Sequence, residues 1–330
     1  MIGIFKQKNP VNFFLLLLFG ILIKLPVFTT YYTPVVNEYD GFLYKILVNF
    51  LNPYNQHFHA LYPLLSVIIL FVQAIMLNSF MNSQRMLNRQ NYLPGLSYLV
   101  ITSLFPEWNQ FSDPMLINTF LLLILIILFK TYNQSEAKGP VFNCGVILGV
   151  ATFFFFPVIV FVLWVFLAMM VIRPFRLNEW LLFLVGLTTP VYFYGGWLYL
   201  TDRWDPSALI PQLSFGFPQL QQNLFLAGGL SLLVIPFLTG AWYVQDNLRK
   251  MLINIRKAWS LFLLYMLGAV LVPFLQPGIN LENWVLIVVP FAAFHASSYM
   301  YTAWRIVPLL FFWLSVAFIL YYQYYEHGWN

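Results

Sequence analysis

The strongest constraint on this chain is a series of long apolar runs that continues from near its first residue to near its last. A helix needs about 20 mostly apolar residues to cross about 30 Å of hydrocarbon. Of the 330 residues, 61% are hydrophobic and only 8% are charged, whereas soluble domains carry about 25% charged residues. The chain is therefore predicted to be all-α, a polytopic transmembrane helical bundle.

Eleven apolar runs are predicted to be membrane helices. They lie at approximately Val11–Phe28, Ala60–Leu77, Tyr92–Phe105, Met115–Phe129, Val141–Phe155, Val158–Ile172, Trp180–Leu200, Leu224–Tyr243, Trp259–Leu275, Trp284–Tyr301 and Ile306–Tyr322. Because no long polar stretch interrupts them, we predict a single transmembrane domain over residues 1–330. The only cysteine, Cys144, excludes an internal disulfide and a metal site built from several cysteines.

The stretch from Val141 to Ile172 is too long for one upright helix. Pro157 near its centre favours two short helices joined by a tight turn, with one kinked helix as the alternative. Loop charge decides between them. A single crossing would move the later clusters Arg249-Lys250 and Arg256-Lys257 to the side opposite the earlier basic loops, so two crossings are predicted.

Charged residues then divide unevenly between the two sides of the bundle. Thirteen of the sixteen Lys and Arg fall on one side, and eight of the eleven Asp and Glu fall on the other. Because basic loops remain in the cytoplasm, we predict a multi-pass protein with a cytoplasmic N-terminus. The net charge of +5 follows from these loops, so nucleic acid is not an expected partner.

The first outward loop carries the carboxylates Glu38 and Asp40. After Asp40 the apolar residues recur at helical spacing, which predicts an amphipathic helix over Asp40–Leu51 that lies on the outer membrane surface and ends at Pro53. Asp40 can alternatively be a simple N-cap of that helix.

The second outward loop is short and carries Glu107 and Asp113. It leads directly into the apolar run that begins at Met115. Ser112 or Asp113 can cap the helix, with Pro114 in its first turn, so here too capping is the alternative to a functional role.

These two loops resemble those of the polyprenyl-phosphate-sugar-dependent glycosyltransferases of the GT-C superfamily, over roughly residues 10–200. The first outward loop of that family carries D-E-x-x-Y before an interfacial helix, and Asp40-Gly41-Phe42-Leu43-Tyr44 is similar, with glycine in place of the second acidic residue. The second has an Asp before a leucine-rich helix, which Ser112-Asp113-Pro114 followed by Met115-Leu116 resembles. The whole chain also resembles a family of Bacteroidota membrane proteins, which implies the bacterial inner membrane.

The resemblance implies a polyprenyl-phosphate sugar donor drawn from the membrane lipid. An acceptor hydroxyl attacks the anomeric carbon, and a carboxylate must accept its proton. Asp40 is the predicted base, and Asp113 is predicted to orient the acceptor or a divalent metal. Glu38 and Glu107 are the remaining carboxylates of the predicted site.

The departing phosphate requires a cation or a carboxylate-bound metal. Three cations are candidates: Lys24 near the outer end of the first helix, Lys45 in the predicted interfacial helix, and Arg203. Lys24 can alternatively extend to the interface. Arg203 can alternatively form an ion pair within its own loop, with Asp202 or Asp205.

Three classes of function remain open. A GT-C-type enzyme, active or catalytically silent, predicts an outward cavity lined by Asp40 and Asp113. A scaffold subunit of a cell-envelope complex predicts that these carboxylates are only caps, and that membrane-protein partners cover the aromatic surface. A lipid transporter predicts a polar path across the bilayer, for which residues such as Gln73, Asn118 and His295 are few. His295 is predicted to be neutral and hydrogen-bonded to a neighbouring helix, with a proton relay as the alternative.

Overall fold

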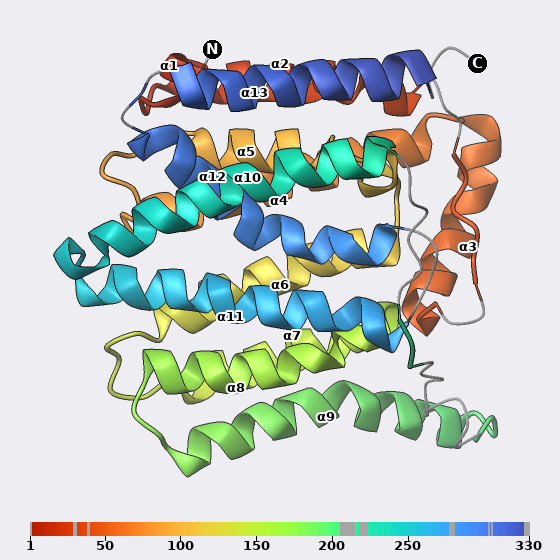
Figure 1. The fold of residues 1–330 in the computed structure, drawn as a ribbon. Coiled ribbons are helices and arrows are strands. Elements are labelled where there is room, and N and C mark those ends of the chain that lie inside the picture. Colours follow the sequence, from red (N-terminus) through yellow and green to blue (C-terminus); the bar gives the residue numbers. More distant parts are fainter. Residues whose placement is uncertain are drawn as a thin grey trace.

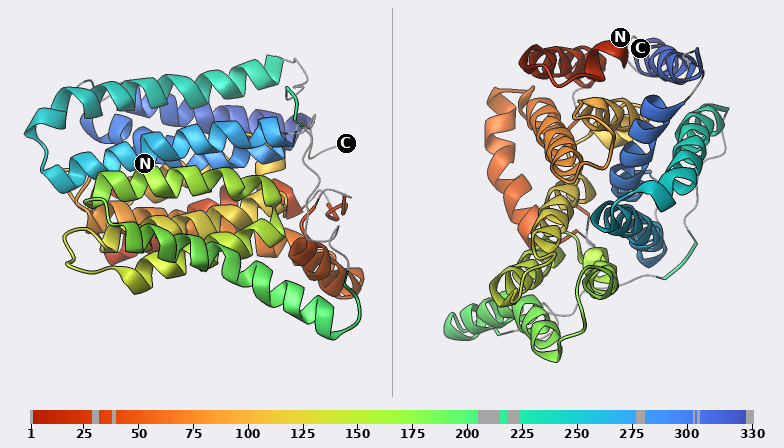
Figure 2. Two further views of the ribbon diagram at one scale, coloured as in Figure 1. Left: turned by 90° about the horizontal axis from the view of Figure 1, so that it is seen from below. Right: turned by 90° about the vertical axis from the view of Figure 1, so that its left-hand side faces the viewer.

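The protein is a bundle of helices whose long axes run roughly parallel (Figure 1). The computed structural model describes residues 2–28, 32–37, 40–204, 215–217, 224–276, 281–302, 304 and 306–326. All regular structure within these residues is helical, as predicted. Viewed along their axes, the helices pack in several layers (Figure 2).

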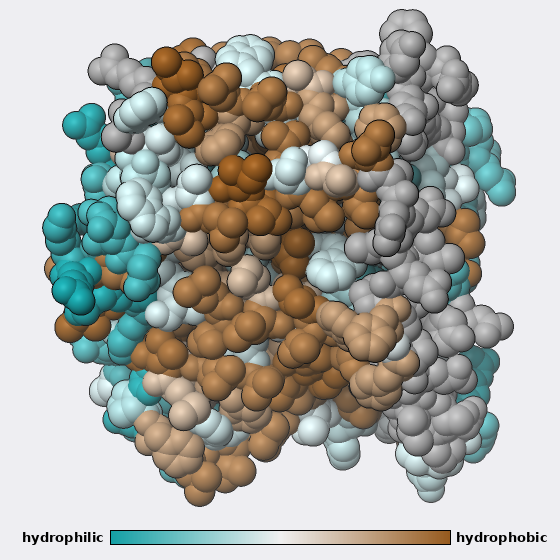
Figure 3. All heavy atoms as spheres, viewed as in Figure 1, coloured by the Kyte–Doolittle hydropathy of each residue, from teal (hydrophilic) through white to brown (hydrophobic). Residues whose placement is uncertain are grey.

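Each of the eleven predicted runs is helical. The elements are α2 (Pro10–Ile23), α4 (Leu61–Ser83), α5 (Leu93–Thr102), α6 (Asp113–Lys130), α7 (Lys138–Phe154), α8 (Phe161–Ile172), α9 (Leu177–Leu200), α10 (Leu224–Asn247), α11 (Ile253–Leu275), α12 (Val288–Tyr301) and α13 (Ile306–Ile319). A short helix, α1 (Ile2–Phe5), precedes them. Within the described residues, seven helices are long and apolar enough to cross a membrane and four shorter apolar helices accompany them. A multi-pass membrane protein follows from these lengths, and an apolar surface covers the middle of the face drawn in Figure 3.

The division at Pro157 is confirmed. Helix α7 ends at Phe154, Phe155 has extended backbone, and the 3-10 turn η3 (Phe156–Val160) leads into α8. Proline is favoured at the start of a helix because its missing N–H would have no partner there. The Phe155-Phe156-Pro157 sequence therefore ends one helix and begins the next.

The predicted interfacial helix is α3 (Phe42–His57), which runs across one end of the bundle at a steep angle to the other helices (Figure 1). Its exposed stripe consists of Phe42, Ile46 and Phe50, while Tyr44 and Val48 are buried against the bundle. The prediction that Pro53 ends this helix is wrong, because α3 continues through it. A proline removes one backbone hydrogen bond and can kink a helix. In α3 the loss of this one bond at Pro53 does not end the helix.

Two helices are brought together by glycine. A Cβ atom on Gly145 would lie 2.2 Å from the carbonyl oxygen of Phe183, and one on Gly149 would lie 2.5 Å from that of Leu187. Only glycine permits this approach of α7 to α9, so the Gly145-x-x-x-Gly149 spacing lets the two helices pack closely.

The two ends of the bundle differ in charge. We call the end that holds α3, the 3-10 turn η2 (Pro106–Asn109) and the start of α6 the carboxylate end, and the opposite end the basic end. At the basic end, the buried Arg173 and Glu179 form a two-point ion pair with N···O distances of 3.0 and 2.8 Å. Arg173 also donates to the carbonyl of Thr131 at 2.6 Å. The buried charges of Arg173 and Glu179 are therefore paired inside the protein.

Some buried polar groups in the helices form hydrogen bonds to neighbouring helices. Nε2 of His295 lies 2.7 Å from the Leu233 carbonyl oxygen in α10, which confirms the predicted hydrogen bond to another helix. The Tyr98 hydroxyl donates to Oε1 of Gln73, whose Nε2 donates to the Met115 carbonyl. These contacts satisfy isolated polar groups where the surroundings are apolar.

Candidate functional site

Four carboxylates from four segments gather at the carboxylate end. Asp40 immediately precedes α3, Glu107 lies in η2, Asp113 begins α6, and Glu282 begins the 3-10 turn η6 (Glu282–Ile287). Their charges are close enough to act on one another: Asp113 is affected by Asp40 and Glu282, and Glu282 by Glu107 and Asp40. The structure thus brings Asp40 and Asp113 into one cluster, which we call the acidic cluster.

Asp113 is the most buried member of the acidic cluster, with 7% of its surface exposed. Its carboxylate contacts the backbone N–H of Asp113 itself, and its Oδ2 atom has no hydrogen-bond partner. Oε2 of Glu107 is also buried without a partner. An unpaired buried acceptor is costly, so each of these two oxygens lowers stability unless a ligand or water donates to it.

Asp40 is not the N-cap of α3, so the capping alternative is wrong for this residue. The N-cap position is Gly41, and no side chain caps it. Oδ2 of Asp40 instead accepts a hydrogen bond from the backbone N–H of Asn37 at 2.8 Å, and the backbone N–H of Asp40 donates to the Asn37 carbonyl. Burial raises the pKa of the Asp40 carboxyl, while the hydrogen bond from Asn37 and the charge of Lys45 act against that rise.

Gly41, which precedes α3, lies against the end of α7. Its N–H donates to the carbonyl of Phe154 at 3.1 Å, at the end of α7. A Cβ atom on Gly41 would lie only 2.3 Å from the carbonyl oxygens of both Phe153 and Phe154. A side chain at this position would displace α3, so the packing of α3 against α7 requires glycine here.

Two tyrosines border the acidic cluster. The Tyr44 hydroxyl donates to the Phe111 carbonyl at 3.2 Å. Burial first, and then the charges of Glu282, Asp40 and Asp113, raise the pKa of Tyr32 to about 12. The Tyr32 phenol therefore stays protonated and can donate a hydrogen bond, whereas the single O–H donor of Tyr44 is already used by Phe111.

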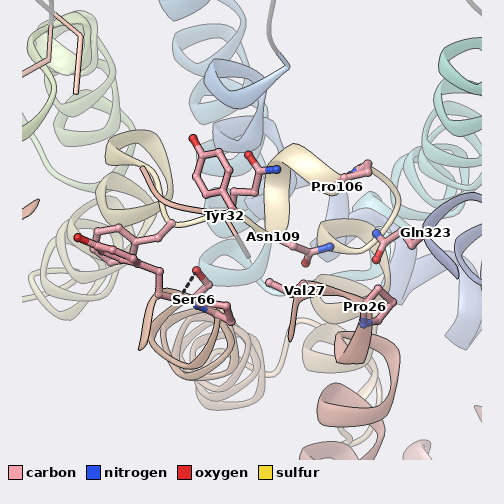
Figure 4. A pocket seen from close by; sticks show the side chains of 11 residues that line it. Pro26, Val27, Tyr32, Ser66, Pro106, Asn109 and Gln323 are labelled. Atoms are coloured by element: carbon pink, nitrogen blue, oxygen red, sulfur yellow. Dashed lines mark hydrogen bonds between the residues drawn. The ribbon is translucent and has the colours of Figure 1, made fainter. Parts of the chain in front are cut away.

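A small pocket lies beside the cluster, between η1 (Leu25–Phe28), the start of α4 and η2. It has a volume of about 110 Å³, and neither Asp40 nor Asp113 is among its lining residues, so it is not the predicted cavity lined by both. Tyr32, Asn109 and Gln323 provide polar side chains around it, with Pro26 and Val27 on another side (Figure 4). We call it the outer pocket.

Lys24 does not extend to the interface. Its side chain is fully buried, and Nζ donates to Oγ1 of Thr102 at 2.9 Å, to Oγ of Ser103 at 3.1 Å and to Oδ1 of Asn109 at 2.5 Å. All three partners are neutral. The ammonium thus joins the end of α2 to α5 and to the wall of the outer pocket.

The remaining predicted residues occupy different places. Lys45 lies one turn into α3, where its charge acts on Asp40. Arg203 is exposed in the loop after α9 and is not among the charges that act on Asp40, Asp113 or Glu282. Glu38 lies outside the described residues.

A metal ion finds no clear ligand set in the part of the chain that the structure describes. No group of three or more His, Cys, Asp or Glu side chains there is arranged to hold one. His57, at the end of α3, has its Nδ1 3.0 Å from the Pro53 carbonyl oxygen of its own helix.

Sequence reasoning missed the roles of Glu282 and Asn109 in this region. Glu282 begins an apolar helical stretch at the same end of the bundle as Asp113, and that shared position is a signal that could have identified it. Asn109 carries no comparable signal, because only its contact with Lys24 reveals it.

The comparison with known proteins gives a family without an activity. Residues 39–328 match the family described as a family of unknown function, DUF6427, and the chain belongs to it. No curated protein and no solved structure matches the chain.

Proposed function

We propose that this member of the DUF6427 family is a membrane glycosyltransferase that moves a sugar from a polyprenyl-phosphate donor to a hydroxyl acceptor at the outer face of a bacterial inner membrane. The observation that carries the proposal is the acidic cluster, in which Asp40 and Asp113 come from different loops and meet beside a pocket at one end of the bundle. The GT-C resemblance of both loops supports the same assignment.

In this mechanism Asp40 is the general base. The acceptor oxygen forms a bond to the anomeric carbon as the bond from that carbon to the phosphate oxygen breaks. The proton of the acceptor hydroxyl passes to Asp40, and the phosphate leaves with the bonding electrons. Asp113, whose Oδ2 has no protein partner, orients the acceptor molecule by accepting a hydrogen bond from another of its hydroxyl groups.

The acidic cluster also constrains where the donor phosphate binds. Four carboxylates repel an anion, so the phosphate must approach from the side away from them. Asn109 lines the outer pocket, and Lys24 contacts Asn109 from inside the protein. Tyr32 also lines that pocket, and the carboxylate charges raise its pKa. The donor phosphate is therefore assigned to the Lys24 side and the acceptor to the side of the carboxylates.

Replacement of Asp40 by Asn tests the proposal, because Asn keeps the size and an acceptor oxygen while it removes the charge. Loss of a general base lowers turnover by about a hundredfold or more. Sugar transfer from a polyprenyl-phosphate donor, measured in membranes with a radiolabelled sugar, should fall by that factor in Asp40→Asn while the protein still accumulates.

Asp202→Asn is the matched control. Asp202 is exposed at the same end of the bundle, and its positive φ of 53° is one that Asn tolerates. Transfer should be unchanged in this variant. Full transfer by Asp40→Asn would exclude the mechanism.

One observation favours a scaffold as the second candidate. Helix α9 presents exposed aromatic side chains near its end, among them Tyr192, Phe193 and Tyr199. In a scaffold, partner helices would cover this face, and the Asp40→Asn and Asp202→Asn variants would behave alike.

A further inference from the structure

Two cavities follow one another along the seam between α2 and α4. The outer pocket is lined by Pro26 and Val27 after α2 and by Pro63 and Ser66 of α4. A second cavity of about 140 Å³, which we call the seam groove, lies at the next turns of the same two helices and is lined by Ile21 and Ile68 among other apolar side chains. The outer pocket is polar in part, and the seam groove is almost wholly apolar.

Lys24 lies at the junction of the two cavities. It lines the seam groove, while its Nζ donates to Asn109, which lines the outer pocket. Among the described residues, no ion pair includes Lys24. A buried ammonium surrounded only by neutral oxygens is expensive to desolvate, and a nearby anion would offset that cost.

Asn109 supplies a directed donor at this junction. An ammonium cannot accept a hydrogen bond, so Oδ1 of Asn109 must face Lys24 and its Nδ2 must face away from it. That Nδ2 atom is buried without a hydrogen-bond partner, and Asn109 is 1% exposed. Lys24 thus positions Asn109, and Asn109 offers a free N–H donor at the wall of the outer pocket.

The seam groove is accessible from the lipid. Ile21 on α2 and Ile68 on α4 line it, and these side chains are 42% and 50% exposed. An apolar chain can therefore enter sideways from the bilayer. A free ion would lose its hydration in a groove of this composition without gaining polar contacts.

We propose that the seam between α2 and α4 binds a single-chain membrane lipid with an oxyanion headgroup, whose chain fills the seam groove and whose headgroup accepts a hydrogen bond from Asn109 in the outer pocket. Charge complementarity with Lys24 selects the anion. Its identification as the sugar donor rests on the proposed function; the binding of the lipid does not.

Binding to the purified full-length chain in detergent tests the proposal with three probes: farnesyl phosphate, farnesol and inorganic phosphate. Farnesyl phosphate should bind at least tenfold more tightly than farnesol, because only it has the anion. Inorganic phosphate should not displace it at equal concentration, because only the lipid fills the groove.

Two pairs of variants locate the site. Ile21→Trp fills the seam groove and should weaken farnesyl phosphate binding at least tenfold, whereas Leu22→Trp, an exposed neighbour that does not line the groove, should leave it unchanged. Asn109→Asp keeps the oxygen that faces Lys24 and replaces the free donor by a charge, so it should remove the preference for phosphate over farnesol without loss of folding. Asn109→Gln is its uncharged control, which should retain part of the preference.

Several results would overturn the proposal: equal binding of farnesol and farnesyl phosphate, displacement by inorganic phosphate alone, or identical behaviour of Ile21→Trp and Leu22→Trp. Asp40→Asn should keep farnesyl phosphate binding. If lipid binds as expected while no chain transfers sugar, the proposed enzyme fails and the lipid site stands. If the chain transfers sugar but farnesyl phosphate binds equally well to the Ile21→Trp and Asn109→Asp variants, the lipid site is wrong and the proposed enzyme stands.

Discussion

The two ends of the bundle bury charge in opposite ways. At the basic end, Arg173 and Glu179 neutralise each other, and Arg173 has a further acceptor in the Thr131 carbonyl. At the carboxylate end, Asp113 and Glu107 each keep a buried oxygen without a partner, and the neighbouring charges have the same sign.

This difference separates structural charge from charge that is available to a ligand. A buried ion pair stabilises because both partners are present, and loss of one leaves the other unpaired. A cluster of like charges lowers stability and persists where a ligand or a reaction uses it. The comparison therefore predicts opposite responses when one carboxylate is neutralised at each end.

The sidedness of the ends can be tested in an all-or-none way. In a Cys144→Ser background, a membrane-impermeant thiol reagent added outside intact cells should label Asp202→Cys and leave Lys138→Cys unlabelled, because basic loops remain in the cytoplasm. Both native side chains are exposed, so access does not limit labelling. The reverse labelling pattern would invert the topology.

Neutralising Glu179, the buried carboxylate at the basic end, should have the largest effect on stability. Glu179→Gln leaves Arg173 buried and unpaired, so the free energy of unfolding should fall by about 3–5 kcal/mol, measured by thermal denaturation in detergent. Glu136→Gln, which affects the exposed Glu136–Lys138 pair, is the control and should show no measurable loss. A Glu179→Gln variant as stable as the native chain would remove the contrast between the ends.

Neutralising Asp113 should do the opposite. Asp113→Asn removes a charge that like charges surround, so stability should not fall. Sugar transfer, if the proposed function holds, should fall by about a hundredfold, because the acceptor loses the carboxylate that orients it. Lower stability together with unchanged transfer would indicate that Asp113 is only a helix-capping group.

The contact of α3 with α7 predicts a smaller effect. In Gly41→Ala the new methyl group meets two backbone oxygens, so stability should fall by about 1–3 kcal/mol through displacement of α3. The matched control is Gly139→Ala, where nothing lies within 4 Å of the added atom. Equal stability of both variants would show that α3 is not fixed at this point.

The smallest expected effect is a pH displacement. The pKa of Asp40 in the folded protein is raised above its ordinary value of 3.8. Protonated Asp40 therefore stabilises the folded protein below pH 3.8, and this contribution is lost as the pH rises through the folded-state pKa. A general base works only when it is deprotonated, so the acid limb of the transfer profile should lie above pH 3.8. The limb should disappear in Asp40→Asn, and a limb at the ordinary value would argue against Asp40 as the base.

Local pattern was enough to predict much of the fold. Each apolar run became a helix because helix formation and burial in lipid depend on the composition of one segment. The division at Pro157 and the amphipathic helix α3 also follow from short-range signals, namely a proline and a stripe of apolar residues. The sidedness of the carboxylates follows from counting crossings, and this brought Asp40 and Asp113 to one end before any contact was known.

The pairing of segments was decided only by the tertiary structure. Nothing in the neighbourhood of Lys24 indicates that it points inward to Asn109, or that Glu282 joins a cluster with residues far away in the chain. In the sequence, Gly41 is the position at which Asp40–Tyr44 differs from the D-E-x-x-Y pattern. In the structure, it is the point where the start of α3 contacts the end of α7. The physical reason is that hydropathy fixes which segments cross the bilayer, whereas contacts between helices depend on the shapes of surfaces that meet only after those segments have packed.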